Sequence, residues 1–139
     1  MTAPRPVGPA DVQPIVADED VVRVRQLVRS VAVAARLSLV DQTKLVTAAS
    51  ELARNTLTHG DGGRVEVETV TGGRRTGVRV LFVDEGPGIA NLDLALTDGY
   101  STGTGLGLGL SGARRLVDEF EIETKPGRGT RVMAIKWAR

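Results

Sequence analysis

The sequence has no cysteine and only one histidine, His59. It therefore cannot form a disulfide or a thiolate metal site, and a metal site built from histidines is not expected. Aromatic residues make up only 3% of the chain. The length predicts a single domain with a real core, so that core must be built from Val, Leu, Ile and Ala.

An excess of charge of one sign is also missing, because the formal net charge is +1. Sequence-independent nucleic-acid binding normally needs a strongly basic face, so nucleic acid is not expected as a partner. No apolar run approaches the roughly 18 to 20 residues that cross a bilayer, and the start of the chain lacks a basic-then-apolar signal. We therefore expect no membrane partner and a cytoplasmic location.

Hydrophobic periodicity predicts the order helix, helix, strand, strand, helix, strand, strand. This order favours an α+β two-layer sandwich, with helices on one face of a mixed, mostly antiparallel sheet. Residues 1–14 hold four of the six prolines and are interpreted as a mobile tail, leaving 15–139 as the folded domain. Helices are expected at 18–37, 38–60 and 110–119, and strands at 64–70, 78–83, 120–124 and 130–137, with a short edge strand near 15–18. Asp18 is the expected cap of the first helix, Ser38 or Asp41 starts the second, and Gly60 is its expected C-terminal cap.

Residues 101–112 contain five glycines directly before the third predicted helix. Glycine lets the backbone approach a bulky anion, and N–H groups leading into a helix direct positive partial charge at a phosphate. The pattern Gly107-x-Gly109-x-x-Gly112 is not a dinucleotide motif, because no strand precedes it, and a Walker-type lysine is absent. A phosphate-binding segment or a flexible loop are the remaining interpretations.

Two further patterns carry polar groups. Glu51 and Asn55 lie one turn apart on the second predicted helix, where their oxygens could hold Mg²⁺ and orient a hydroxyl, or form an ordinary solvated pair. Asp84 follows the apolar strand 78–83 on its core face, where a carboxylate needs a hydrogen-bond donor. Gly86-Pro87-Gly88 then predicts a tight turn.

These patterns occur in a fixed order: Glu51-x-x-x-Asn55, Asp84-x-Gly86-x-Gly88, and Gly103-x-Gly105-Leu-Gly107-Leu. Together they resemble the N box and the two glycine boxes of the superfamily that includes gyrase B, MutL, heat-shock chaperone ATPases and sensor histidine kinases. The segments 50–55, 111–120 and 127–137 are similar to the RsbT-type serine/threonine kinases, in the anti-sigma regulatory branch. The resemblance implies a Bergerat-type ATP-binding fold.

The resemblance also implies roles for individual residues, with ATP and Mg²⁺ as cofactors. Asp84 would accept the adenine amino group, with Gly86 and Gly88 against the base and ribose. Asn55 would ligate Mg²⁺, and Glu51 would act as the catalytic base. The phosphates would be wrapped under a lid by Thr102, Gly103, Thr104, Gly105, Leu106 and Gly107.

One role stays open, because no Lys or Arg lies between Arg79 and Arg114. Related kinases place a basic residue near the γ-phosphate, and here Arg114, Arg115 or a residue of the protein substrate could take its place. A histidine kinase is not expected, because His59 lies near a helix end beside glycines. Gyrase, MutL and chaperone relatives use far larger chains.

Two functions follow from the resemblance. The first is a protein-serine/threonine kinase that phosphorylates a STAS-domain antagonist in a partner-switching pathway and then binds a phosphatase. The alternative is an anti-sigma factor or nucleotide-dependent binding switch with little kinase activity; a homodimer is compatible with both. Arg25, Arg29 and Arg36 form a stripe on the first predicted helix, which is either a solvated face or a docking surface for an acidic partner.

Overall fold

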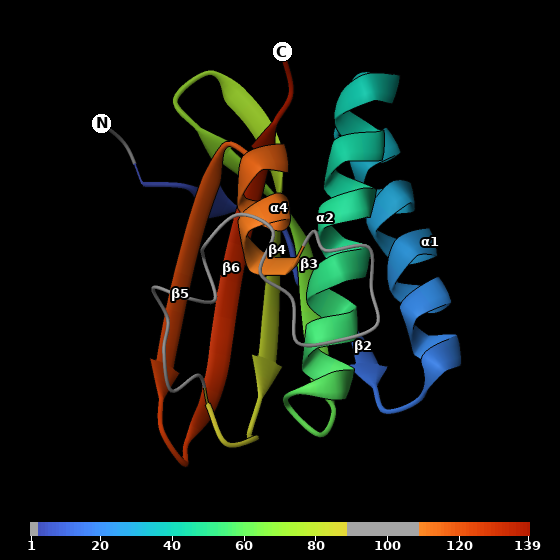
Figure 1. The fold of residues 1–139 in the computed structure, drawn as a ribbon. Helices are drawn as coiled ribbons and strands as arrows, with labels where there is room; N and C mark the ends of the chain where they lie inside the picture. Colours follow the sequence, from blue (N-terminus) through green and yellow to red (C-terminus); the bar gives the residue numbers. More distant parts are fainter. Residues whose placement is uncertain (1–2, 89–108) are drawn as a thin grey trace.

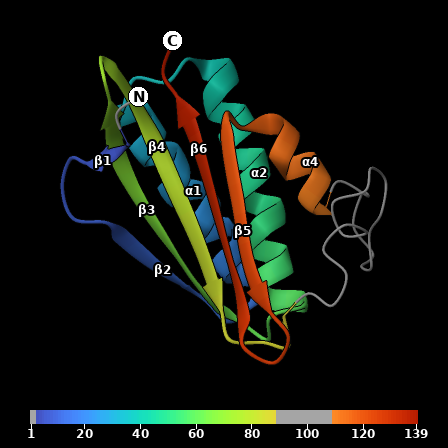
Figure 2. The same cartoon turned by 90° about the vertical axis from the view of Figure 1, so that its left-hand side faces the viewer.

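The structure is a computed structural model that describes residues 3–88 and 109–139. A sheet forms one layer and helices cover one of its faces (Figures 1 and 2). The helices are α1 (Asp18–Ala34), α2 (Leu39–Thr58) and α4 (Gly109–Leu116). The strands are β1 (Arg5–Pro6), β2 (Asp11–Ile15), β3 (Gly63–Gly72), β4 (Arg75–Asp84), β5 (Glu119–Lys125) and β6 (Gly129–Trp137).

The sheet has the strand order β1-β3-β4-β6-β5, and β2 also pairs with β3. Each of these pairings is antiparallel. A two-residue turn joins β3 to β4, and its first residue, Gly73, has a φ of 61°, as a hairpin turn of this length requires. The predicted α+β sandwich is confirmed, and β4 is central, as its apolar sequence indicated.

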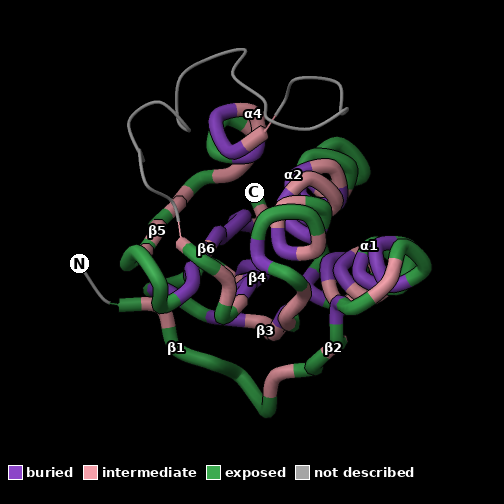
Figure 3. Tube along the Cα trace, turned by 60° about the horizontal axis from the view of Figure 1, so that its bottom comes forward, coloured by how far each residue is buried: buried purple, intermediate pink, exposed green. Residues whose placement is uncertain are grey.

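The core lies between the helices and the sheet and is aliphatic. Figure 3 shows the buried stretches of α1 and α2 turned toward the sheet. Helix α2 packs against both α1 and α4 as well as the sheet, and its buried residues include Ala48, Ala49 and Ala53. These small side chains let neighbouring elements approach α2 closely. Larger residues such as Val24, Leu45, Leu52, Val67 and Val80 fill the space between the layers, each contributing about 1.5–3 kcal/mol by burial.

The N-terminal segment differs from the expected mobile tail. Strand β2 pairs along Gly63 to Val67 of β3, and β1 pairs with Val70 and Thr71 of the same strand. Both strands lie at the edge of the sheet, where a proline is tolerated because one row of backbone groups has no strand partner. Ile15, at the end of β2, is completely buried. Two of the four prolines, Pro6 and Pro14, therefore lie in edge strands, and the segment is not an unpaired tail.

The ends of the first two helices correct three smaller expectations. The predicted cap Asp18 is already helical, and the carboxylate of Asp20 instead accepts the N–H groups of Val16 (2.9 Å) and Ala17 (3.1 Å). Helix α1 ends at Ala34, so Arg36, with a φ of 66°, lies beyond the helix and is not part of the predicted arginine stripe. Helix α2 begins after Ser38, whose hydroxyl accepts the Asp41 N–H, and the cap at its other end is one residue before the predicted Gly60.

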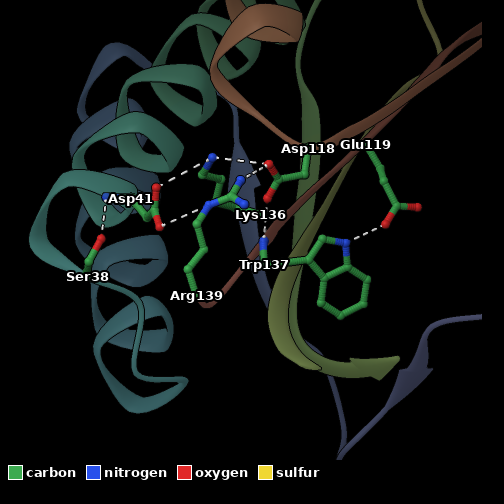
Figure 4. A network of polar contacts seen from close by, with 7 residues as sticks. All are labelled: Ser38, Asp41, Asp118, Glu119, Lys136, Trp137 and Arg139. Atoms are coloured by element: carbon green, nitrogen blue, oxygen red, sulfur yellow. Dashed lines mark hydrogen bonds and ion pairs between the residues drawn. The ribbon is translucent and has the colours of Figure 1, made fainter. Parts of the chain in front are cut away.

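A cluster of ion pairs joins the start of α2 to the end of the chain (Figure 4). We call Asp41, Asp118, Lys136 and Arg139 the ionic clamp. The Lys136 side chain is 5% exposed, and its Nζ lies 3.5 Å from Asp41 and 3.3 Å from Asp118. Arg139 contacts the same two carboxylates, and the Trp137 N–H donates to Asp118 at 2.8 Å. The clamp therefore connects α2, β6 and the segment between α4 and β5.

Candidate active site

Asp84 is the last residue of β4, on the face that carries Val80 and Phe82 toward the helices. Its Oδ1 accepts the Gly86 N–H at 3.0 Å, which supplies the donor that the sequence required. Burial raises the pKa of Asp84; backbone N–H groups of Gly86 and Thr130 oppose this rise, and the nearby charge of Asp61 adds to it. Asp84 is thus a half-buried acceptor held by backbone groups.

Four glycines from three chain segments surround Asp84, and we call Gly60, Gly63, Gly86 and Gly129 the glycine collar. A Cβ on Gly60 would lie 2.4 Å from the Asp84 Cγ, and one on Gly129 would lie 2.1 Å from the Asp84 backbone oxygen. A Cβ on Gly86 would lie 2.7 Å from the Gly60 Cα. On Gly63 it would lie 2.0 Å from the backbone oxygen of the residue before Asp84. Backbone therefore packs directly around this carboxylate.

The predicted turn Gly86-Pro87-Gly88 rests on the connection between β5 and β6. The Gly127 N–H donates to the Pro87 carbonyl at 2.8 Å. Gly88 has a φ of 78°, and a Cβ there would lie 2.5 Å from the carbonyl oxygen of Lys125. The turn is held at the edge of a hollow of about 420 Å³, which is lined by residues 60–64 and 83–85 and has Asp84 in its wall.

Glu51 and Asn55 lie one turn apart on α2, and both are half-buried. The Asn55 carbonyl accepts the N–H of Gly60 at 3.3 Å, and Gly60 in turn lies against Asp84. The last turn of α2 therefore brings the predicted metal ligand and the predicted adenine acceptor to the same end of the sandwich. Asn55 and Asp84 are 29 residues apart in the chain, so the sequence gave no direct indication that Gly60 links them.

The remaining predicted site residues lie outside the described part of the chain. These are Thr102, Gly103, Thr104, Gly105, Leu106 and Gly107, and the predicted lid lies there too. Helix α4 begins shortly after them at Gly109 and packs on α2 through Leu110 and Ala113. Arg114 and Arg115 are exposed in the last turn of α4, so the cation for the γ-phosphate stays unassigned.

The residues present fit a nucleotide and Mg²⁺. Across residues 3–88 and 109–139, no group of three or more His, Asp or Glu side chains could hold a metal. Asn55 and Glu51 instead offer an amide oxygen and a carboxylate, and Mg²⁺ accepts such oxygens while sharing its remaining positions with phosphate and water. Because the collar residues are glycines, backbone lies directly beside the Asp84 acceptor. Such a surface suits a flat base.

Comparison with known proteins decides the family. The model of the histidine kinase-, DNA gyrase B- and HSP90-like ATPases matches residues 40–138. This chain belongs to that family. It is 42% identical over 125 residues to the serine/threonine-protein kinase RsbT of Bacillus subtilis (strain 168), which covers 90% of this chain and 94% of the relative.

Two other matches agree with this assignment. An anti-sigma F factor of Clostridium beijerinckii (strain ATCC 51743 / NCIMB 8052) is 30% identical over 118 residues, or 76% of this chain and 81% of the relative. The crystal structure of the RsbU and RsbW domains of a Mycobacterium tuberculosis protein shares the fold, with a TM-score of 0.66 and 21% identity. That match covers 95% of this chain and 33% of the larger one. The resemblance inferred from the three motifs is confirmed, and the family's ATPase domain implies ATP as the nucleotide.

Sequence reasoning missed three members of the glycine collar. It interpreted Gly60 only as a helix cap, and it assigned Gly63 and Gly129 no role around Asp84. Their contacts join residues 20 or more positions apart in the chain, so no local pattern shows them. The available signal was that glycines cluster near the C-terminal ends of α2, β4 and β5. Such a cluster indicates that these ends lie close together.

Proposed function

We propose that this protein is an ATP-dependent protein-serine/threonine kinase that phosphorylates a STAS-domain antagonist in a partner-switching pathway. The observation that carries the proposal is that the last turn of α2, which includes Asn55, is linked through Gly60 to Asp84, with Glu51 one turn earlier on the same helix. The identity to RsbT over nearly the whole chain supports the kinase assignment. The STAS substrate class is taken from the resemblance of the 50–55, 111–120 and 127–137 segments.

Each residue has a distinct task in this proposal. Asp84 accepts a hydrogen bond from the adenine amino group and stays oriented because the Gly86 N–H holds its Oδ1. Asn55 holds Mg²⁺ through its side-chain oxygen, and Mg²⁺ supplies positive charge to the phosphate oxygens. Glu51 accepts the proton of the serine or threonine hydroxyl as it attacks the γ-phosphorus. Residues 102–107, which lie outside the described residues, would bind the phosphates.

We propose that the partner docks on the exposed surface of α1 and on its connection to α2. Arg25 is exposed, whereas Arg29 is half-buried and donates to Gln42 of α2 at 3.1 Å. Arg25 is therefore the better candidate for an acidic partner, and Arg29 has a structural contact as well. No helix in the described ranges is long and apolar enough to span a membrane, and we propose that the reaction takes place in the cytoplasm.

The second candidate function is a nucleotide-dependent binding switch, acting on a phosphatase or sigma factor. Large aliphatic side chains are exposed on both sides of the α1–α2 connection: Val33 (55%), Leu39 (71%) and Val40 (64%). Clustered exposed aliphatic residues are typical of protein interaction sites. A homodimer would also use such a surface.

Phosphate transfer separates the two functions. The protein is incubated with ATP, Mg²⁺ and purified STAS-domain proteins, and phosphate is located by mass spectrometry. A kinase phosphorylates a serine or threonine of one STAS protein, and Glu51→Ala abolishes this. A pure binding switch retains a nucleotide-dependent complex without any phosphate on the partner.

A further inference from the structure

Gly60 makes the closest contact with the Asp84 side chain in the glycine collar. A Cβ at position 60 would lie 2.4 Å from the Asp84 Cγ, 2.6 Å from its Oδ2 and 2.6 Å from its Cβ. Rotation of the Asp84 side chain could move Cγ and Oδ2 away. It could not move Cβ, because that atom is fixed by the backbone of β4.

The backbone around Gly60 has little freedom to relieve this contact. The Gly60 N–H donates to the carbonyls of Thr56 (3.1 Å) and Asn55 (3.3 Å), which ties it to the last turn of α2. Gly86 also packs against Gly60, since a Cβ there would lie 2.7 Å from the Gly60 Cα. Gly60 does not adopt a left-handed φ, so its φ does not require glycine. The close contact with Asp84 does.

We propose that Gly60 is a positioning residue that sets the place and orientation of the Asp84 carboxylate, and thereby the preference for adenine over guanine. This inference rests on the proposed role of Asp84 as the adenine acceptor. A carboxylate can accept a hydrogen bond from the 6-amino group of adenine, whereas guanine presents a carbonyl oxygen at that position. The discrimination depends on where the carboxylate lies, and Gly60 is the residue whose side-chain volume would move it.

The inference predicts a base-specific defect. A change at Gly60 that shifts Asp84 weakens the hydrogen bond to adenine but leaves the groups that bind the phosphates in place. A purely structural role for Gly60 would weaken ATP and GTP alike. The ratio of ATP to GTP affinity therefore distinguishes a positioning role from a general loss of packing.

The test uses isothermal titration calorimetry of the full chain with ATP and GTP in the presence of Mg²⁺. Gly60→Ala should lower ATP affinity by about 10- to 100-fold, the size of one hydrogen bond to a charged group, and change GTP affinity by less than about threefold. The matched control is Gly8→Ala, because a Cβ at Gly8 meets no atom within 4 Å. An unchanged ATP-to-GTP ratio in a folded Gly60→Ala protein would overturn the inference.

Two further variants complete the design. Asp84→Asn should reduce the same ratio; if it does not, the proposed role of Asp84 fails independently of Gly60. Asp84→Glu keeps the charge but adds a methylene beside Gly60, so it should lose ATP affinity as strongly as Asp84→Asn. Asp84→Glu does not alter Gly60, and therefore tests the inference even if Gly60→Ala does not fold. ATP binding by Asp84→Glu within threefold of the parent would contradict it.

Discussion

The carboxylates near the two ends of α2 have different neighbours. At the N-terminal end, Asp41 and Asp118 meet the side-chain cations of Lys136 and Arg139. At the C-terminal end, Asp84 has no ion pair among the described residues and is held by the backbone N–H groups of Gly86 and Thr130.

The pKa values of Asp118 and Asp84 shift in opposite directions because of this difference. Burial by itself would raise the pKa of Asp118, but the Trp137 N–H and the charges of Lys136 and Arg139 outweigh it, so that this pKa is lowered. For Asp84, burial and the charge of Asp61 outweigh the two backbone N–H groups. A carboxylate neutralised by cations serves stability, whereas one that lacks a cation can accept a hydrogen bond from a ligand. The following variants test this contrast.

The largest expected effect is on catalysis at the C-terminal end. Glu51→Ala should reduce phosphate transfer by about 10²- to 10⁴-fold, because a general base acts on the attacking hydroxyl. ATP affinity should change little, since the base does not hold the ground-state phosphates. Single-turnover transfer and calorimetry measure the two quantities. Transfer at the parental rate would remove Glu51 from the base role.

A comparable energy is expected in stability at the clamp. Lys136→Met should lower the free energy of unfolding by about 3–5 kcal/mol, because it leaves the buried Asp41 carboxylate with only the exposed Arg139. Urea denaturation measures this loss. Asp41→Asn combined with Asp118→Asn and Lys136→Met should recover part of it, since no buried charge then remains without a partner. Equal stability of Lys136→Met and the parent would show that the clamp contributes nothing.

The third variant weakens nucleotide binding without weakening the fold. Asp84→Asn should reduce ATP affinity by about 10- to 100-fold, because the amide is a poorer acceptor than the carboxylate. The nucleotide-free protein should be as stable as the parent or more stable, since Asn removes a partly buried charge without a cation. Calorimetry measures the ATP affinity, and thermal unfolding measures the stability of the nucleotide-free protein. Unchanged ATP affinity would remove Asp84 from the adenine role.

The pH dependence of stability should differ in sign at the two carboxylates. The folded-state pKa of Asp118 lies below 3.8, so its stabilising contribution is present above pH 3.8 and is lost as the pH falls through the folded-state pKa. The folded-state pKa of Asp84 lies above 3.8, so its contribution is present below pH 3.8 and is lost as the pH rises through the folded-state pKa. At neutral pH, the free energy of unfolding should therefore be lower than that of the parent for Asp118→Asn and equal or higher for Asp84→Asn. Both differences should shrink as the pH falls to 3.8 and below.

The smallest effect on the fold is expected away from both ends, on α1. Arg25→Glu should weaken binding of the STAS protein or phosphatase, more at low salt than at high salt, because exposed charges steer an acidic partner and salt screens them. The stability change should stay within about 0.5 kcal/mol, as for most exposed substitutions. Arg29→Gln is the comparison variant, since it disturbs the contact with Gln42. Partner affinity that is unchanged and independent of salt would assign Arg25 to a solvated face.

Local chemistry explains why much of this molecule was predictable. Alternation along 78–83 placed Asp84 at the core face of a central strand, and helical spacing placed Glu51 and Asn55 together. Ser38, one of two expected starts of α2, is its cap, because its hydroxyl needs only the N–H of Asp41, three residues away. At α1 the cap position is Ala17, which has no side-chain acceptor, and Asp20 in the first turn accepts the N–H groups of Val16 and Ala17 instead.

By itself, the sequence determined the order of the elements, the aliphatic core and the three motifs that identify the family, because each depends on spacings within a few residues. Tertiary structure alone decided that residues 5–6 and 11–15 pair with β3, that Lys136 lies between Asp41 and Asp118, and that Gly60 lies against Asp84. These contacts join residues far apart in the chain. Burial and close backbone approach then decide which charge needs a cation and which carboxylate keeps its capacity to bind a ligand.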